Sequence, residues 1–401
     1  MRIIYLTHWF DPEPGVIKGP RFVRALEAAG HEVTVVTGFP NYPGGRLYPG
    51  YRLRPIMRET IDGVSVVRLP LYPSHDGSSL HRALTFLSFF LSVLIYCLAR
   101  RTRFALAYVY HPPITVGLAA ALAGLVRRLP FVLEVQDLWP DTVAATGMGG
   151  GRWIARLLDP LCRFVYRRAA AILVQSEGMR RTLIARGVPP AKIAVSRNWA
   201  DLDPLPGRSS PTSGQPLTIV YGGNFGRAQA LAAVVDAAML VEKRRRDIRI
   251  LLYGAGIDAA MLRERARRAG LSILEFRDRI PRHAIAEVFA RADALLHHLA
   301  ADPLFEITIP SKTQVYLATG RPIVAGIAGE AADLLRESGA ALVVPPMDPT
   351  ALAQAICALA EMSPAEREAM GRAGRLFYQR TLSFEQGMAR TLTLIEGTNA
   401  A

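Results

Sequence analysis

The sequence has few cysteines, and its opening apolar run is short. Its three cysteines, Cys97, Cys162 and Cys357, are scattered and odd in number. This excludes a disulfide framework and a zinc-ligand spacing, and it favours a reducing compartment. The apolar run at residues 1–6 is too short for a signal peptide and is followed at once by His8. We therefore interpret this run as a buried first strand.

Acidic residues are also scarce relative to basic ones, 34 against 48, which gives a formal net charge of +14. A surplus of this kind favours anionic partners, such as nucleotides, phosphorylated lipids, a membrane surface or nucleic acid. Arginine supplies nearly all of the surplus, so a bias in genome composition explains it equally well. The chain has no Walker loop, no Gly-x-Ser-x-Gly elbow and no His-Glu-x-x-His helix.

The 401 residues exceed what one hydrophobic core usually supports, so two domains are expected. Strands and helices alternate from the first strand at residues 3–6 onward, which is typical of a doubly wound α/β fold. A stretch rich in proline, glycine and serine at residues 201–216 interrupts this alternation and predicts a linker. The alternation restarts at residue 218.

We therefore expect an α/β protein of two Rossmann-like domains that face each other across a cleft. The domains would span residues 1–200 and 217–379, and a C-terminal helix at about 380–401 would pack back on the first domain. The alternative is one large α/β sheet with an irregular insertion.

One uncharged segment, residues 83–99, is flanked by four arginines: Arg82, Arg100, Arg101 and Arg103. It is shorter than the roughly 20 apolar residues that a spanning helix needs. It is therefore either a buried core helix or a helix lying in the membrane interface with its arginines near lipid phosphates.

The strongest local motif is YGGNFGRAQ at residues 221–229, between a predicted strand and a predicted helix. Glycines such as Gly222 and Gly223 let a backbone approach a ligand, and a helix start favours an anion. Arg227 adds a planar donor group suited to phosphate oxygens. The alternative is a tight turn with a surface arginine.

A second motif runs over residues 306–322, as a loop that leads into a short helix. Ser311 is the predicted N-cap of this helix and Gly320 its end. Glu306 and Lys312 could together bind a sugar hydroxyl group and a phosphate, although a surface Glu–Lys pair is the simpler interpretation.

Polar residues also follow two predicted strands of the first half. His111 lies at the end of one strand, and residues 134–141 place carboxylates and an aromatic ring at the end of another. Ligands of such sheets bind outside the carboxyl ends of the strands. A lone histidine near prolines, however, is more often structural than catalytic. His297 and His298 are neighbours in a predicted strand, so their rings point to opposite faces and cannot share a metal.

Taken in order, these motifs resemble the retaining glycosyltransferases of family four, which have the GT-B fold. The resemblance is strongest to the branch that contains colanic-acid and O-antigen fucosamine-type transferases. It covers nearly the whole chain and rests on short motifs in a shared order: Pro14-Gly15, residues 30–33, residues 111–113, residues 134–141, residues 221–229, residues 309–312, and residues 344–346 with Asp348.

The resemblance implies four catalytic residues, which are His111, Asp137, Arg227 and Lys312. His111 would lie against the donor sugar and Asp137 on the acceptor side. Arg227 would hold the donor diphosphate, with Lys312 near the same phosphates or the donor sugar.

The resemblance also implies substrate-binding residues, namely Pro14, Gly15, Gly222, Gly223, Asn224, Glu306, Ser311 and Gln314. The Gly15 loop would share the diphosphate with Arg227. Many family members carry two glutamates before the Gly-x-Pro strand, and here the second position falls on Val315, beside Gln314. Asn224 stands where the glycine loop usually has an arginine.

The expected reaction is sugar transfer from a nucleotide-diphosphate donor, which we expect to be UDP-linked, to a glycan on polyprenyl diphosphate. It needs neither a metal nor another cofactor, because the nucleotide sugar is a substrate and cationic side chains can stabilise the leaving diphosphate. We expect a cytoplasmic protein bound peripherally to the inner face of the cell membrane, through its anionic surface, and no nucleic-acid partner. The alternatives are a sugar-nucleotide epimerase of the same fold and a basic nucleic-acid-binding protein.

Overall fold

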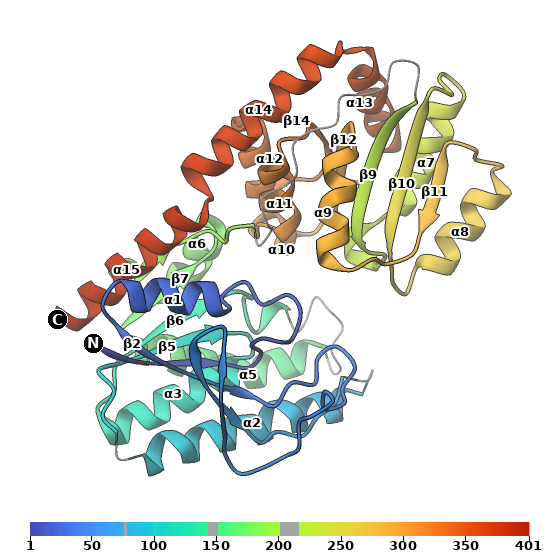
Figure 1. Cartoon of the computed structure of the whole chain (residues 1–401). Coiled ribbons are helices and arrows are strands. Elements are labelled where there is room, and N and C mark those ends of the chain that lie inside the picture. The colour runs from blue at the N-terminus through green and yellow to red at the C-terminus, as the bar shows by residue number, and fades with distance from the viewer. Residues whose placement is uncertain (76–77, 101, 143–150, 201–215, 401) are drawn as a thin grey trace. The chain divides into compact units, whose positions relative to one another are not determined.

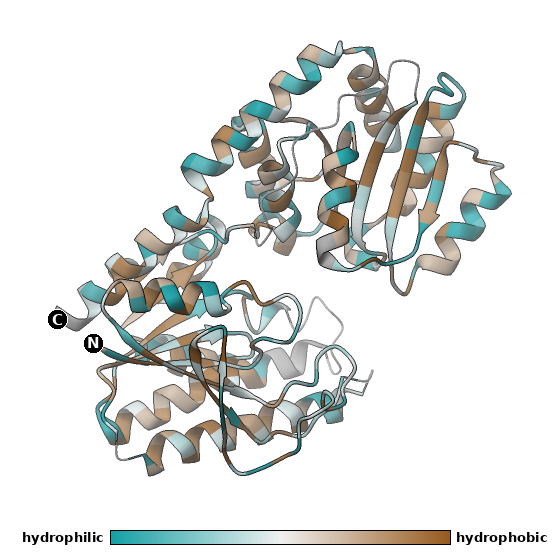
Figure 2. Cartoon of the chain, in the orientation of Figure 1, coloured by the Kyte–Doolittle hydropathy of each residue, from teal (hydrophilic) through white to brown (hydrophobic). Residues whose placement is uncertain are grey.

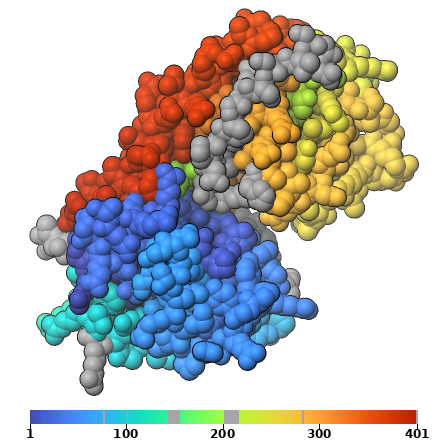
Figure 3. All heavy atoms as spheres, in the orientation of Figure 1, coloured from blue at the N-terminus to red at the C-terminus, as the bar shows by residue number. Residues whose placement is uncertain are grey.

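The computed structural model describes residues 1–75, 78–100, 102–142, 151–200 and 216–400 (Figure 1). The chain divides into two compact units. The first comprises Met1–Arg197 together with Gly387–Ala401, and the second comprises Asn198–Gln386. Each unit has its own sheet, which excludes the alternative of one large sheet. Figure 3 shows the heavy atoms of both units in the same orientation.

The sheet of the first unit has eight strands in the order β3-β4-β2-β1-β5-β6-β7-β8. All of its pairs are parallel except the antiparallel pair of β3 and β4. The strands are β1 (Arg2–Thr7), β2 (Glu32–Gly38), β3 (Met57–Ile61), β4 (Val64–Leu69), β5 (Leu106–His111), β6 (Phe131–Val135), β7 (Ala171–Val174) and β8 (Ile193–Val195).

Helices cover both faces of this sheet, with α1 on one face and α2 and α3 on the other (Figure 1). They are α1 (Pro20–Ala28), α2 (Ser79–Ala99), α3 (Ile114–Arg127), α5 (Gly151–Arg168), α6 (Glu177–Ala185) and the short η1 (Pro190–Lys192).

The sheet of the second unit has six parallel strands in the order β11-β10-β9-β12-β13-β14. They are β9 (Leu217–Asn224), β10 (Ile248–Ala255), β11 (Leu274–Arg277), β12 (Ala294–His298), β13 (Ile323–Gly326) and β14 (Ala341–Val344). The helices are η2 (Arg227–Gln229), α7 (Ala232–Glu242), α8 (Ala259–Arg268), α9 (Arg282–Arg291), α10 (Pro303–Glu306), α11 (Ser311–Thr319), α12 (Gly329–Glu337), α13 (Pro349–Glu361), α14 (Pro364–Thr381) and α15 (Phe384–Ala400).

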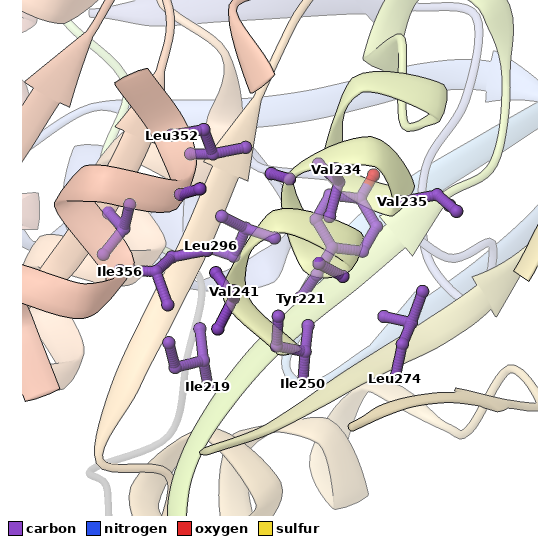
Figure 4. Close-up of a cluster of buried hydrophobic side chains, with 14 of the residues drawn as sticks. Ile219, Tyr221, Val234, Val235, Val241, Ile250, Leu274, Leu296, Leu352 and Ile356 are labelled. Carbon is purple, nitrogen blue, oxygen red and sulfur yellow. The ribbon is translucent and has the colours of Figure 1, made fainter. Parts of the chain in front are cut away.

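The central strand β9 is buried on both sides, as expected for a parallel sheet. Ile219 and Tyr221 enter one apolar cluster with residues of α7 and α13 (Figure 4). Val220, between them, enters a second cluster with residues of α9, α11 and α12. Strands β9 and β10 are accordingly apolar along most of their length (Figure 2). Apolar clusters cover both faces of this sheet. A ligand can therefore reach the sheet only at the ends of its strands.

The predicted linker at residues 201–216 lies outside the described residues, apart from Pro216, so its role stays a prediction. The C-terminal helix α15 begins at Phe384, and its residues from Gly387 onward belong to the first unit. There the hydroxyl group of Ser196 donates a hydrogen bond to the backbone oxygen of Gly387 at 3.5 Å.

The uncharged segment forms most of α2, which begins four residues before the predicted run and has 21 residues. One helix in the described residues, α2 itself, is long and apolar enough to cross a membrane by length and composition. Five large apolar residues on one of its faces are exposed: Leu80, Leu84, Leu87, Leu91 and Ile95. Its opposite face, including Phe89 and Val93, is buried. The helix is therefore not simply a buried core helix.

Candidate active site

Each sheet reverses its strand order once, and this topology predicts where a ligand binds. In the first unit the chain adds β2 and β4 on one side of β1, then β5 to β8 on the other side. In the second unit it adds β10 and β11 beside β9, then β12 to β14 on the other side. Ligands of open α/β sheets bind outside the carboxyl ends of the strands at such a reversal. The two candidate sites are therefore the ends of β1 and β5 and the ends of β9 and β12.

In the first unit, His111 is the last residue of β5. Its ring is fully buried, and neither ring nitrogen has a hydrogen-bond partner in the described structure. Burial lowers its pKa to about 3, so the imidazole is neutral at physiological pH. The Trp139 ring lies edge-on to it, with centroids 6.0 Å apart.

Asp137 lies just beyond the end of β6, the next strand. The backbone nitrogen of Gln136 donates to the carbonyl of His111 at 3.0 Å, which fixes the segment beside the histidine. Burial raises the pKa of the Asp137 carboxyl, so this group holds a proton more readily than an exposed aspartate.

Pro14 and Gly15 are exposed in the loop that follows β1. Gly15 has φ +84°, a conformation that favours glycine, and a Cβ placed on it would meet nothing within 4 Å. The loop is fixed by Glu13, whose buried carboxylate accepts hydrogen bonds from the backbone nitrogens of Asn41 and Tyr42, both at 2.9 Å.

In the second unit, Lys312 on α11 lies against the glycines of β9. A Cβ placed on Gly223 would be 2.5 Å from the Lys312 Nζ, so any side chain at this position would have to displace the ammonium group. The same nitrogen lies 5.0 Å from the centroid of the Tyr221 ring, a cation–π distance. Burial lowers the pKa of Lys312 from 10.5 to about 8.

The neighbouring residues hold this arrangement in place. The Tyr316 hydroxyl group accepts a hydrogen bond from the backbone nitrogen of Gly222 at 3.2 Å, which ties α11 to the end of β9. A Cβ on Gly222 would be 2.6 Å from the Phe289 ring. Arg227 is exposed three residues beyond the end of β9. Within the described residues, neither Arg227 nor Lys312 forms an ion pair, so both cations are available to an anion.

Two sequence families match the chain in the same order as its two units. One, described as "Glycosyl transferase 4-like domain", matches residues 20–199, and the other, described as "Glycosyl transferases group 1", matches residues 216–362. The chain is a glycosyltransferase. It belongs to the family-four type of the GT-B glycosyltransferases.

Known relatives agree with this assignment. WcaI of Escherichia coli, named as a colanic acid biosynthesis glycosyl transferase, is 27% identical over 325 residues, which is 74% of this chain and 76% of WcaI. WbjE of Pseudomonas aeruginosa, named as a glycosyltransferase, is 26% identical over 58% of this chain and 60% of WbjE. The crystal structure of Anabaena HepE with UDP and glucose shares the fold, with a TM-score of 0.68 at 14% identity over 98% of this chain and 99% of HepE.

One local expectation for the glycosyltransferase needs correction. Ser311 is not the N-cap of α11, because Pro310 already holds the extended cap conformation and Ser311 is the first helical residue. Arg227 lies before the next long helix. It begins the three-residue turn η2, and the left-handed backbone of Ala230 separates this turn from α7, which starts at Ala232. This turn can therefore attract an anion through the charge of the Arg227 side chain, but not through the N-terminus of a long helix.

The remaining predicted binding residues surround the glycine motif or lie near α11. Asn224 is exposed at the end of β9, and its amide nitrogen would be 2.8 Å from a Cβ placed on Gly226. Gln314 is buried, and its amide nitrogen, in the orientation that satisfies it, donates to the carbonyls of Pro310 at 2.8 Å and Ser311 at 3.1 Å. Glu306 is the exposed last residue of α10. Their roles toward a substrate stay predictions.

His297 and His298 have different partners, in line with their predicted opposite directions. The His297 Nε2 lies 3.3 Å from the Thr313 hydroxyl group. The His298 Nδ1 lies 2.8 Å from the carbonyl oxygen of Gln229, and its Nε2 accepts from the backbone nitrogen of Met347 at 3.2 Å. His298 thereby joins β12 to the η2 turn.

Sequence reasoning missed a buried ion pair beneath the first site. The Lys18 ammonium lies 2.7 Å from the Glu134 carboxylate, and both side chains are 1% exposed. Lys18 also donates to the Tyr108 hydroxyl group at 3.2 Å, and the Gln136 amide donates to Glu134 at 2.6 Å. Glu134, one of the carboxylates expected at the end of β6, is thus occupied within the fold. The pair connects the Gly15 loop with the segment that carries Asp137.

Replacing Glu134 by Gln should lower the free energy of unfolding by about 3–5 kcal/mol, because it removes the buried carboxylate charge that faces the Lys18 ammonium. The matched control is Glu32→Gln, which removes the exposed pair of Glu32 with Arg2 and should cost about 1 kcal/mol or less. Urea unfolding followed by tryptophan fluorescence measures both. Equal losses in the two variants would show that the buried pair contributes no more to the free energy of unfolding than the exposed pair.

Nucleotide affinity should depend on pH through Lys312. Its lowered pKa means that the ammonium is charged below about pH 8 and neutral above it, so affinity for a nucleoside diphosphate should fall as pH rises. Between pH 7 and pH 9 the dissociation constant should rise about tenfold. Calorimetric titration should show this rise in the wild type and in Lys243→Met, a control on the same unit. It should be absent in Lys312→Met, and a flat wild-type profile would contradict the site.

Proposed function

We propose that the glycosyltransferase moves a sugar from a UDP-linked donor to a sugar carried on polyprenyl diphosphate, with retention of configuration. The observation that carries this proposal is the pair of cations, Lys312 and Arg227, at the strand reversal of the second sheet. The UDP in the HepE complex and the polysaccharide role in the name of WcaI support the two substrate classes.

In the proposed reaction, the acceptor hydroxyl oxygen forms a bond to the anomeric carbon while the bond from that carbon to the donor phosphate oxygen breaks. The hydroxyl proton passes to the departing diphosphate, which lies on the attacked face when configuration is retained. Lys312 and Arg227 stabilise the negative charge that grows on this diphosphate. His111, neutral because of burial, would hydrogen-bond the donor sugar, and Asp137 would face the acceptor.

Replacing Arg227 or Lys312 by Ala should lower kcat more than it weakens donor binding, because the charge they stabilise grows toward the transition state. The expected loss is about a hundredfold to a thousandfold in kcat. Arg227→Lys should restore only part of it, since a point charge cannot replace the planar fork. EDTA should leave the rate unchanged.

The measurement is steady-state kinetics with saturating donor, using Lys243→Ala as the control for loss of a surface cation. Near wild-type kcat in both Ala variants, or loss of activity with EDTA, would place the diphosphate elsewhere. Incubation with donor alone separates transfer from epimerisation, because an epimerase would convert the nucleotide sugar without an acceptor.

We further propose that the exposed face of α2 rests on the anionic inner surface of the cell membrane. Its five exposed apolar residues have the spacing of one helical face. At the C-terminal end of the helix, burial lowers the pKa of Arg100 and the nearby charge of Arg58 lowers it further. The Arg100 carbonyl accepts a hydrogen bond from Arg127. Like charges gathered beside an apolar face fit a surface of anionic lipid. Arg101, also expected to take part, lies outside the described residues.

Replacing Leu87 and Leu91 together by Glu should weaken binding to vesicles of phosphatidylglycerol and phosphatidylcholine at least about tenfold. The control is Leu376→Glu, which changes a leucine of similar exposure, 55%, on α14 of the second unit. Vesicle sedimentation measures binding. Unchanged binding of the double variant, or equal loss in the control, would contradict docking through α2.

A further inference from the structure

His8 follows the last residue of β1, at the strand reversal of the first sheet. Thr7, the residue before it, pairs in register with Tyr110, the residue before His111. The two histidines therefore occupy equivalent positions at the ends of neighbouring strands. This is where the topology predicts a ligand.

Both histidines are buried, with His8 1% and His111 0% exposed, and no ring nitrogen of either has a hydrogen-bond partner in the described structure. Burial lowers the pKa of both to about 3, so each neutral ring offers one donor and one acceptor. A buried polar group without a partner is costly, and its presence in a native structure needs an explanation.

Another buried histidine of this chain, His298, differs in the hydrogen bonding of its ring. His298 is also buried, but both of its ring nitrogens are matched by backbone groups, the Gln229 carbonyl and the Met347 amide. His8 instead lies among aromatic rings, with centroids 4.7 Å from Trp9 and 4.8 Å from Phe89.

A continuous series of ring contacts joins the two unpaired histidines. The His8 ring contacts Phe86 at 5.4 Å, Phe86 contacts Trp139 at 6.1 Å, and Trp139 contacts His111 at 6.0 Å. Aromatic faces with a few polar groups that lack partners suit a sugar ring, whose C–H groups pack on the rings and whose hydroxyl groups take the hydrogen bonds.

We propose that His8 is a second substrate-contacting residue of the first unit and binds a hydroxyl group of the acceptor sugar. The inference rests on the proposed transfer to a lipid-linked sugar. It assigns His8 to the acceptor because Phe86 and Phe89 belong to α2, whose opposite face exposes the leucines proposed to meet the membrane. His111 remains the residue expected at the donor sugar.

The test compares His8→Phe with His31→Phe. His31 is also nearly buried and has an unpartnered ring nitrogen, but it precedes β2, at the amino ends of the strands where this type of sheet does not bind ligands. His8→Phe removes both nitrogens and keeps an aromatic ring. It should raise the acceptor KM at least tenfold, leave the affinity for UDP unchanged, and leave the melting temperature equal or higher. His31→Phe should keep the wild-type acceptor KM.

Acceptors for this test are farnesyl-diphosphate-linked glucose, galactose and N-acetylglucosamine. His8→Asn, which retains hydrogen-bonding atoms, should recover part of the acceptor affinity. An acceptor KM in His8→Phe equal to that of His31→Phe would overturn the inference, as would a lower melting temperature without recovery in His8→Asn.

A measurement without turnover separates this inference from the proposed function. The imidazole nitrogen resonances of His8, assigned with His8→Asn, should shift when an acceptor of the panel is added to the wild type. A shift without sugar transfer would leave the His8 site in place and contradict the proposed reaction. No shift with any of the three acceptors would overturn the His8 site, whether or not transfer occurs.

Discussion

The reversal of strand order in each parallel sheet is the constraint on which the candidate site depends. Because crossover connections between parallel strands are right-handed, a chain that extends its sheet first to one side and then to the other places helices on both faces. At the reversal, the connections that follow the two central strands lead to opposite sides. No connection therefore crosses the carboxyl ends of these two strands, and a ligand can bind there. In both sheets the two sides meet at the first strand, so the reversal lies between β1 and β5 in one sheet and between β9 and β12 in the other. His111 and the glycine motif with Arg227 lie at two of these strand ends, and α11 brings Lys312 against Gly223 of β9.

Two buried lysines show how the same fold uses one side chain in two ways. Lys18 is paired with Glu134 and fixes a loop to the sheet, so its charge is compensated within the protein. Lys312 has no carboxylate partner in the described structure and rests on the bare backbone of Gly223 and the face of Tyr221. Burial without a partner is what lowers its pKa to about 8. In the free protein the buried ammonium lacks a compensating negative charge, which is unfavourable. A bound diphosphate would supply that charge, and the relief of this unfavourable burial would add to the binding free energy.

Much of the architecture could be predicted from the sequence because the pattern is local. Alternating apolar strands and helices identified two α/β units and placed His111, Asp137 and the glycine motif at strand ends. Details that depend on backbone geometry were less predictable. Pro310 displaced Ser311 as the N-cap, and Ala230 separated the Arg227 turn from its helix. Contacts between distant segments left no sequence signal. The pairing of Lys18 with Glu134 and the lack of hydrogen-bond partners for His8 in the described structure both depend on which residues of different strands lie side by side. Only the three-dimensional structure gives this information.

The central claim, that the donor diphosphate binds the Lys312 ammonium against Gly223, is tested most directly by titrating UDP into Gly223→Ala in a calorimeter. The added methyl group would occupy the position of the ammonium, 2.5 Å from its nitrogen. Gly270→Ala is the control, since it too introduces a side chain at a glycine of the second unit but with nothing within 4 Å. UDP affinity should fall about tenfold in Gly223→Ala, as expected for loss of a hydrogen bond to a charged group, and should stay near wild type in Gly270→Ala. Equal affinity in wild type and Gly223→Ala would contradict it.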